Sequence, residues 1–344
     1  MEILFIGHYD EGSTSRMRGE YLQEILQPKN FIVANIDPPL KATNKLLRSF
    51  GWRFKAGPLI KKINDHIVSV IDDKWEYDMV WVEKGVFIDP AIIEKLSKHS
   101  KKLVHFTPDP AFTYHRSGLF YKALPFYDHC VTTKSFETGY YFKNGAKDLI
   151  TCTQGFDPAL HKPYHSFTQK KGIIFIGHYE KDRAEIISGL LKRDYPVTLA
   201  GINWSRFARR NKENSHLTYL GDGVFGESYA RTISGALLGL GLLSRIIPEM
   251  HTTRTIEIPA CGTALITERN NETGAMFSEE DVFFFTDTED LFAKVGDALT
   301  NEDRLRSVTE NGAKKVHEGG YDYRSILVRI LKQVYPAGEW PLRN

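Results

Sequence analysis

The sequence predicts an α/β protein of two successive domains, each a parallel sheet covered by helices. The motif FIGHY occurs twice, in ILFIGHYD at residues 3–10 and in IIFIGHYE at residues 173–180. Each copy ends an apolar, strand-like run and precedes a charged, helix-like segment, which is how a Rossmann-like domain begins. The length of 344 residues is consistent with two domains, because each half is long enough to bury its own core. The alternative is a chance likeness of two apolar strand openings.

Composition and charge are those of an ordinary soluble protein. Hydrophobic residues make up 42% and charged residues 26% of the chain, and a net charge of +2 gives no overall reason to expect nucleic acid. Met1 and Glu2 lead directly into a strand-like run, so we expect no signal peptide and a cytoplasmic location. Residues 233–243, the longest apolar stretch, are too short to span a bilayer and are expected to form a buried strand. Three cysteines without metal-binding spacing are expected to be reduced thiols.

The loop after the first strand is a candidate anion site. Residues 12–15 form a short polar loop that begins with Gly12, and Arg16 and Arg18 lie in the first turn of the next helix. Cations there oppose the helix dipole, so a bound anion would suit them, although two solvated arginines are the plain alternative. The loop has no GxGxxG pattern, which argues against a nicotinamide-dependent dehydrogenase.

Residues 41–62 form a basic stretch with aromatic residues interleaved. It contains seven Lys or Arg residues and no Asp or Glu. Such a surface could contact an anionic lipid or an anionic acceptor, which would make the protein peripheral to the inner face of a membrane. The other interpretation is a solvated helix face that packs through its aromatic residues.

Polar residues follow the predicted strands of the first half. Besides the first strand, strands are expected at residues 78–82, 102–106 and 128–133. Ligands of parallel α/β sheets bind beyond the carboxyl ends of the strands, so the residues that follow are candidates for the cleft and for a general base. They are His8, Glu83, Lys84 and Asp109, with His105 and His115 nearby. A histidine held by hydrogen bonds in the core is the alternative for each imidazole.

A proline-bearing segment, TQGFDPALHKP at residues 153–163, separates the halves. We expect an N-terminal domain of residues 1–165, a second domain of residues 166–321, and a C-terminal helix and tail of residues 322–344 that return to the first domain.

In the second domain, Gly177 ends the repeated strand and Arg183 opens the next helix. Trp204 could stack on a nucleobase, or it could be a partly buried aromatic residue. Acidic residues near Thr286 could suggest a metal site, but Thr286 and Glu289 have the spacing of a capping box that opens a helix. We therefore predict no metal.

Residues 249–267, EMHTTRTIEIPACGTALIT, are the strongest candidate for a ligand site. They indicate a polar turn, a short helix that carries Glu257, a break at Cys261 and Gly262, and a buried strand. Amide groups at the start of that helix, together with Arg254, would suit a phosphate, and Glu257 could accept hydrogen bonds from hydroxyl groups. An amphipathic helix whose Glu and Arg only pair with neighbours is the alternative.

The sequence of this stretch resembles that of a known family. EIPACG resembles the EAMACG segment of retaining GT-B glycosyltransferases of the family 4 type, and RTIEIPACG is closer still to the CgeB-like, spore-maturation glycosyltransferases. The resemblance implies the GT-B fold, with two Rossmann-like domains facing across a cleft and a C-terminal helix that crosses back. It implies that Glu257 holds the donor ribose and that residues 251–254 face the diphosphate and sugar. Further donor-side residues implied are Gly12, Arg16, Gly177, Arg183, Trp204, His251, Thr252 and Thr253.

The function implied is transfer of a sugar from a nucleotide-diphosphate donor to an acceptor hydroxyl, without metal or cofactor. The family 4 resemblance implies retention, for which no dedicated protein base is required. The alternative is inversion, for which a carboxylate or histidine of the cleft must accept the proton. Glu249, Arg254 and Asp109 are the candidate catalytic residues. The partners expected are a nucleotide sugar and a glycan, lipid-linked or small-molecule acceptor, and no nucleic acid. A nucleotide-sugar epimerase on the same scaffold, or a surface-associated binding protein that has lost catalysis, are the rival interpretations.

Overall fold

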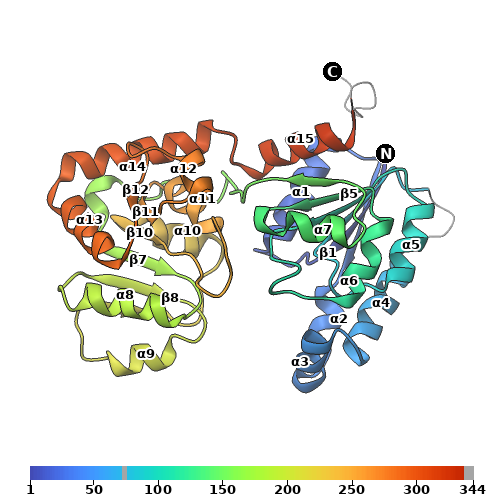
Figure 1. Cartoon of the computed structure of the whole chain (residues 1–344), viewed down its shortest axis with the longest axis horizontal. Coiled ribbons are helices and arrows are strands. Elements are labelled where there is room, and N and C mark those ends of the chain that lie inside the picture. Colours follow the sequence, from blue (N-terminus) through green and yellow to red (C-terminus); the bar gives the residue numbers. More distant parts are fainter. Residues whose placement is uncertain (72–75, 337–344) are drawn as a thin grey trace. The chain divides into compact units, whose positions relative to one another are not determined.

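The computed structural model describes residues 1–71 and 76–336 and divides the chain into two compact units (Figure 1). The first unit contains Met1–Thr153 and the C-terminal segment that begins at Tyr323, and the second contains Gln154–Asp322. The segment at residues 153–163 therefore lies almost wholly within the second unit.

The first unit is built on a six-stranded parallel sheet in the order β2-β1-β3-β4-β5-β6. Its strands are β1 (Glu2–Gly7), β2 (Asn30–Asn35), β3 (Met79–Glu83), β4 (Leu103–Thr107), β5 (His129–Thr132) and β6 (Leu149–Thr151). Its helices are α1 (Thr14–Leu26), α2 (Asp37–Lys41), α3 (Lys45–Phe54), α4 (Pro58–Val70), α5 (Pro90–Lys98), α6 (Gly118–Ala123), α7 (Thr138–Lys143) and α15 (Tyr323–Val334), with 3-10 turns η1 (Leu124–Phe126) and η2 (Ser135–Glu137).

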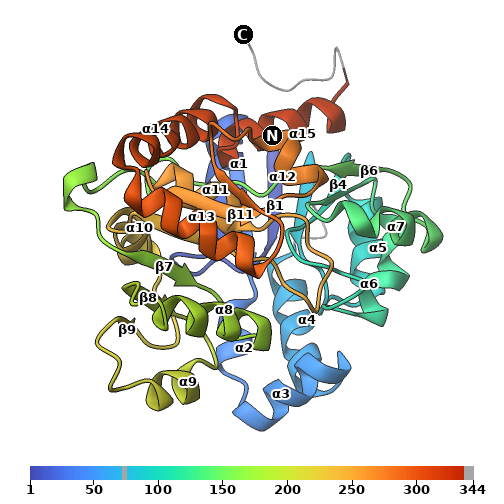
Figure 2. The same cartoon turned by 60° about the vertical axis from the view of Figure 1, so that its left-hand side comes forward.

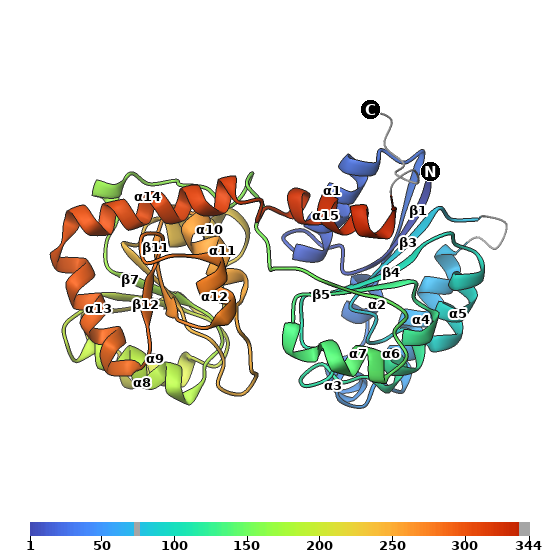
Figure 3. The same cartoon turned by 45° about the horizontal axis from the view of Figure 1, so that its top comes forward.

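Alternating side chains of these strands build one core on each face of the sheet. Leu4 and Ile6 belong to one buried cluster, whereas Ile3 and Phe5 belong to the other, as the two-residue period of a strand requires. The second cluster also contains the inward face of α15, which lies beside α1 (Figure 3). The C-terminal helix is thus part of the first unit.

The second unit repeats the architecture with the order β12-β11-β10-β7-β8-β9, again all parallel. Its strands are β7 (Ile173–Ile176), β8 (Val197–Ala200), β9 (Leu217–Tyr219), β10 (Leu238–Gly241), β11 (Ala264–Glu268) and β12 (Phe283–Phe285). Its helices are α8 (Lys181–Leu191), α9 (Ser205–Arg210), α10 (Gly226–Ser234), α11 (Thr253–Ala260), α12 (Asn271–Met276), α13 (Thr288–Thr300) and α14 (Glu302–Glu318), with a 3-10 turn η3 (Phe167–Gln169).

The predicted fold class, two Rossmann-like α/β domains, is confirmed, and the two FIGHY motifs end β1 and β7. Two local predictions were wrong. Residues 233–243 are not one strand, because α10 runs to Ser234 and β10 begins only at Leu238. The cap of α13 is Asp287, whose side chain accepts from the N–H of Asp290, while Thr286 bonds the Asp290 carboxylate.

Across residues 1–71 and 76–336, no helix is long and apolar enough to span a membrane. Within the same ranges, no three His, Cys, Asp or Glu side chains gather closely enough to hold a metal ion.

Candidate functional site

Two arginines, Arg183, which is buried, and Arg254, which is partly buried, meet at the carboxyl ends of β7 and β10 in the second unit. Arg254, in the first turn of α11, donates from Nη2 to the carbonyl oxygen of Leu242 at 2.9 Å. Arg183, in the first turn of α8, donates to the same oxygen at 3.5 Å and pairs with Glu180 at 2.8 Å. The Nε atom of each arginine is buried and has no hydrogen-bond acceptor within the described part of the chain.

The charge of this arginine pair is only partly balanced. Burial, and next the charge of Arg254, lower the pKa of Arg183 to about 10. Arg183 is still ionised at neutral pH, so two cations share one carbonyl oxygen, and each has a buried N–H that meets no acceptor among the described residues. Because a buried donor without an acceptor is costly, the pair favours an anion with several acceptor oxygens.

The second FIGHY loop lies against this pair. A Cβ atom on Gly177 would stand 3.1 Å from Nη1 of Arg254, so the glycine leaves room for the guanidinium. Trp204 is fully buried and donates from Nε1 to the Gly177 carbonyl at 2.8 Å. Gly201 has φ +138°, and a Cβ there would stand 1.9 Å from that same oxygen. Trp204 therefore supports the loop, and its buried ring offers no face to a nucleobase.

The turn before α11 is held by its own side chains. His251 is buried; its Nδ1 bonds the carboxylate of Glu272, and its Nε2 accepts from the N–H of Gln154 at 3.0 Å. Because Nε2 accepts, the proton resides on Nδ1 and the ring fastens residue 154 to the turn. The N–H of Thr252 donates to Oγ1 of Thr255 at 3.1 Å. One of the amides expected to face an anion is thus already occupied.

Two further predicted residues flank this turn. Thr253 is the first residue of α11 and is partly exposed, and Glu249 lies in the preceding loop with its N–H donating to Ile247. The negative charge of Glu249 is also close enough to raise the pKa of Arg183, against the larger lowering by burial. Glu249 therefore lies near Arg183 and Arg254, in the loop that precedes α11.

Glu257 is buried one turn into α11 and already has two side-chain neighbours. Its Oε2 accepts from the Tyr229 hydroxyl at 2.6 Å, and its Oε1 lies 3.7 Å from Nε2 of His161. Nδ1 of His161 accepts from the N–H of Asp157, so the ring proton is on Nε2 and is directed toward Glu257. Burial, and next Glu257, raise the pKa of Tyr229 well above its ordinary value, so Tyr229 stays a donor.

His161 and Tyr229 were missed as site residues from the sequence. His161 lies in the segment that was interpreted as a linker, and Tyr229 lies on α10, 28 residues before Glu257. The only sequence signal for His161 was the aspartate four residues before it. At this spacing the N–H of Asp157 reaches the imidazole of His161.

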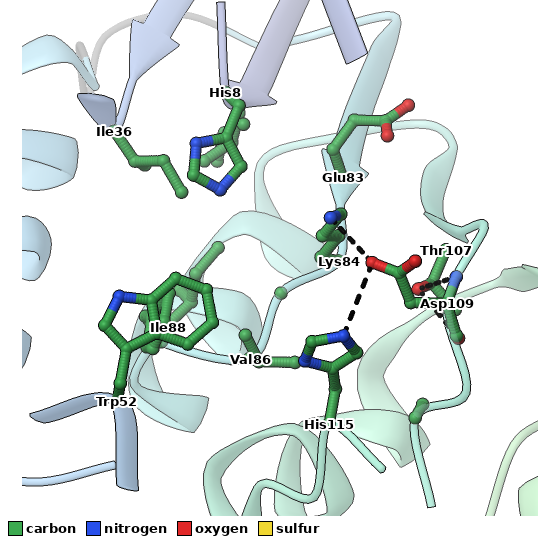
Figure 4. Close-up of a pocket in the computed structure, with 15 residues that line it drawn as sticks. His8, Ile36, Trp52, Glu83, Lys84, Val86, Ile88, Thr107, Asp109 and His115 are labelled. Carbon is green, nitrogen blue, oxygen red and sulfur yellow. Dashed lines mark hydrogen bonds and ion pairs between the residues drawn. The ribbon is translucent and has the colours of Figure 1, made fainter. Parts of the chain in front are cut away.

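A second candidate site lies in the first unit, in a pocket at the carboxyl ends of β1, β3 and β4 (Figure 4). Five residues predicted to face a cleft line this one pocket, namely His8, Glu83, Lys84, Asp109 and His115. The remaining wall is largely apolar and includes Ile6, Ile36, Trp52, Val86, Phe87 and Ile88.

Asp109 is the polar centre of the pocket. Its Oδ2 lies 2.6 Å from Nζ of Lys84 and 3.8 Å from Nε2 of His115 (Figure 4). Burial would raise the pKa of Asp109, but Lys84 and then His115 outweigh it and hold this pKa below its ordinary value. Burial also lowers the pKa of His115, against the opposite effect of Asp109. At neutral pH the pocket thus holds a carboxylate, an ammonium and a neutral imidazole.

Lys84 is positioned by the backbone and by a buried histidine. It has φ +63°, in the left-handed region that side chains rarely adopt. His105 is fully buried, and its Nε2 lies 3.1 Å from the Lys84 carbonyl oxygen. Burial lowers the pKa of His105 to about 4, so the neutral ring donates to that oxygen from Nε2. His105 is therefore a support of Lys84.

Glu83 lines the pocket with its backbone side, while its carboxylate is used inside the protein. Arg18 donates from Nε at 2.9 Å and from Nη2 at 2.7 Å, and Trp81 donates from its indole at 3.0 Å. A Cβ on Gly7 would stand 2.6 Å from the Cβ of Glu83, so the glycine of the first FIGHY motif permits this approach.

The other predicted residues of the first unit have local partners. The anion near Arg18 is Glu83, whereas Arg16 pairs with Glu20 at 2.7 Å on the surface. Gly12 has φ +79°, which suits glycine in the turn before α1. His8 bonds the Asp37 carboxylate through Nδ1. The structure thus brings His8 to the pocket and leaves Arg16 on an outer helix face.

Comparison with known proteins gives the family of one segment and the fold of the whole. Residues 183–332 match the model of a family described as glycosyl transferase-like. No curated protein matches the chain. Among solved structures, sucrose-phosphate synthase from Thermosynechococcus elongatus superposes with a TM-score of 0.67 at 14% identity, covering 97% of this chain and 98% of that one.

Two further solved structures are similar to this chain over nearly its whole length. HepE from Anabaena, solved with UDP and glucose, has a TM-score of 0.66 at 13% identity and covers 97% of this chain and 99% of its own. A glycosyltransferase from Rickettsia africae has a TM-score of 0.64 at 14% identity, with coverage of 98% and 99%. The chain therefore has the GT-B fold, and the segment that matches the glycosyl transferase-like model carries both Arg183 and Arg254.

Proposed function

We propose that the protein is a glycosyltransferase that moves a sugar from a nucleotide-diphosphate donor to an acceptor hydroxyl. One observation carries the proposal. The guanidinium groups of Arg183 and Arg254 converge at the end of a parallel sheet, and each has a buried N–H with no acceptor in residues 1–71 and 76–336. The family match of residues 183–332 and the GT-B fold support it. HepE, which shares the fold, was solved with UDP and glucose.

In this proposal the second unit binds the donor. The diphosphate would occupy the arginine pair, where its oxygens satisfy the two free N–H groups. When the bond between the anomeric carbon and the diphosphate breaks, negative charge grows on the departing oxygen. Arg183 and Arg254 would stabilise that charge without a metal ion. Glu257, held by Tyr229, would accept a hydrogen bond from a ribose hydroxyl.

The acceptor would enter the pocket of the first unit. Lys84, Asp109 and His115 are the polar groups there, and the apolar wall would exclude water from the acceptor hydroxyl. We propose transfer with retention, in which the acceptor oxygen bonds to the anomeric carbon on the face that the diphosphate leaves. The acceptor proton then passes to the departing diphosphate, so no protein base is required.

A panel of UDP-, GDP- and dTDP-sugars tests donor binding by thermal shift and calorimetry. We expect saturable binding of one of these, and weaker binding of it by the Arg254 variant described below. No saturable binding of any would refute the proposal and favour a binding protein without catalysis.

Product analysis tests the reaction itself. With donor and acceptor present, the new glycosidic bond should keep the anomeric configuration of the donor, which proton NMR of the product reports. Efficient conversion of the donor sugar to its epimer when no acceptor is present would replace the transferase by an epimerase.

A further inference from the structure

Helix α3 carries an exposed apolar stripe on the first unit. Leu46, Phe50 and Phe54 follow one another at intervals of four residues and are 83%, 47% and 59% exposed. Leu47, on the same side of the helix, is also exposed. Residues four apart lie one above another on a helix, so these side chains form one continuous strip. We call Leu46, Leu47, Phe50 and Phe54 the α3 stripe.

The other side of α3 is fixed to the unit, so the α3 stripe cannot turn inward. A Cβ on Gly51 would stand 2.6 Å from the Cβ of Leu59, which shows how closely α3 approaches α4. Trp52 packs edge-on against Phe87, with ring centroids 4.7 Å apart. The helix also has a defined start, because the Asn44 side chain accepts from the N–H of Leu47. Figure 2 shows α3 at the rim of the first unit, beyond α4.

Positive charge surrounds the α3 stripe. Between Asp37 and Asp65 the sequence contains seven Lys or Arg residues and no Asp or Glu. Lys41 and Lys61 pair with Asp10 and Asp65 respectively. The five other cations, Lys45, Arg48, Arg53, Lys55 and Lys62, are exposed or partly exposed and have no ion pair with any carboxylate in the described ranges.

We propose that α3 docks the first unit onto a membrane surface rich in anionic lipid. An anionic bilayer offers negative charge for Lys45, Arg48, Arg53 and Lys62, and it offers an apolar layer into which Leu46 and Phe50 can insert. Nucleic acid supplies only the charge. The buried centres of protein interfaces are poor in lysine, so a second protein fits this cation-rimmed strip less well.

The docking would also place the pocket of the first unit near the lipid head groups. Trp52 lines that pocket from α3, and the helix that carries it is only about 10 Å across. If the proposed transferase function holds, an acceptor carried on a lipid would reach Asp109 and Lys84 from the membrane. The docking itself depends only on exposure and charge, so it can fail or succeed independently of that function.

Sedimentation of the full chain with vesicles tests the docking. Vesicles of phosphatidylcholine alone are compared with vesicles of equal parts phosphatidylcholine and phosphatidylglycerol. We expect binding to the anionic vesicles that weakens as salt is added, because screening reduces the attraction of Lys45 and its neighbours. The double variant Leu46→Ser, Phe50→Ser should bind these vesicles roughly tenfold or more weakly.

Phe225→Ser is the matched control, because Phe225 is 80% exposed but belongs to the second unit. It should bind vesicles like the native chain, and both variants should keep the native Tm and donor binding. Absence of binding to anionic vesicles, equal binding by the Leu46, Phe50 variant, or equal binding to neutral vesicles would each overturn the proposal. A dimer of the native chain that the double variant abolishes, without vesicle binding, would assign the α3 stripe to a second copy instead.

Discussion

Arg254→Met separates a ligand-binding role of the arginine pair from a structural one. Methionine keeps the length and the apolar stem of the side chain and removes the guanidinium. In the absence of ligand Arg254 donates one good hydrogen bond, to Leu242 at 2.9 Å, and one long one, to Ile176 at 3.4 Å. It also repels Arg183, whose pKa it helps to lower.

The expected effect on stability is therefore small. Losing the bond to Leu242 costs about 0.5–1.5 kcal/mol, and removing the repulsion between the two cations offsets part of this cost. For a unit of this size the Tm should move by no more than about 3 °C in either direction. The expected effect on donor binding is larger, because a charge-assisted bond from Nε to the diphosphate contributes about 1.5–3 kcal/mol, or roughly 10- to 150-fold in Kd.

Calorimetry with the best donor from the panel gives the Kd, and a thermal melt without ligand gives the Tm. Arg209→Met is the matched control, because Arg209 is an exposed arginine in the same unit. A variant that loses several degrees of Tm yet binds the donor with native affinity would show that Arg254 only braces the loops, and the reasoning above would be wrong.

Four other single variants, one double variant and one pH profile test the remaining assignments. Glu257→Ala should weaken donor binding by about 1–3 kcal/mol, and unchanged affinity in calorimetry would remove Glu257 from the site. Asp109→Asn should raise the KM for acceptor while leaving donor Kd unchanged, which initial rates at varied acceptor check. The acceptor-dependent rate should stay level as pH falls and decrease only below about 6.5, because the pKa of His115 is lowered. Below that pH the protonated ring of His115 would compete with Lys84 for Asp109. His115→Gln should abolish this decrease of the rate at acid pH. Glu83→Gln leaves the buried Arg18 without its carboxylate and should lower the free energy of unfolding by about 3–5 kcal/mol, as urea unfolding measures. The double variant Arg18→Met, Glu83→Leu should recover much of this free energy.

The sequence was informative wherever position along a strand decides the outcome. Residues that directly follow parallel strands must emerge at one edge of the sheet, and Lys84 and Asp109 therefore reach the same pocket. The FIGHY repeat predicted two similar units for the same reason. In each copy a strand ends near the glycine, and the glycine lets another side chain approach the backbone closely.

What the sequence could not predict is which distant side chains pair. Arg18 and Glu83 are 65 residues apart, and an arginine early in a helix gives no sign that its anion lies inside the protein. Tyr229 meets Glu257 only because α10 and α11 pack together in the second unit. Trp204 has an aromatic ring that could stack on a base, but the folded chain buries this ring among the aromatic side chains of Phe175, Tyr179 and Phe207. Such pairings follow from tertiary packing, which local pattern does not encode.

The two FIGHY motifs support different electrostatic environments, and this difference favours an anionic donor in the second unit. In the first unit Gly7 admits Glu83, whose carboxylate neutralises Arg18, and nearby Lys84 is matched by Asp109. In the second unit Gly177 admits Arg254 next to Arg183, and their Nε atoms have no acceptor within the described residues. A balanced pocket suits a neutral hydroxyl, whereas a pair of guanidinium groups that Glu180 balances only in part suits a diphosphate. The same strand-to-glycine ending thus positions a compensated charge in one unit and a partly compensated charge in the other.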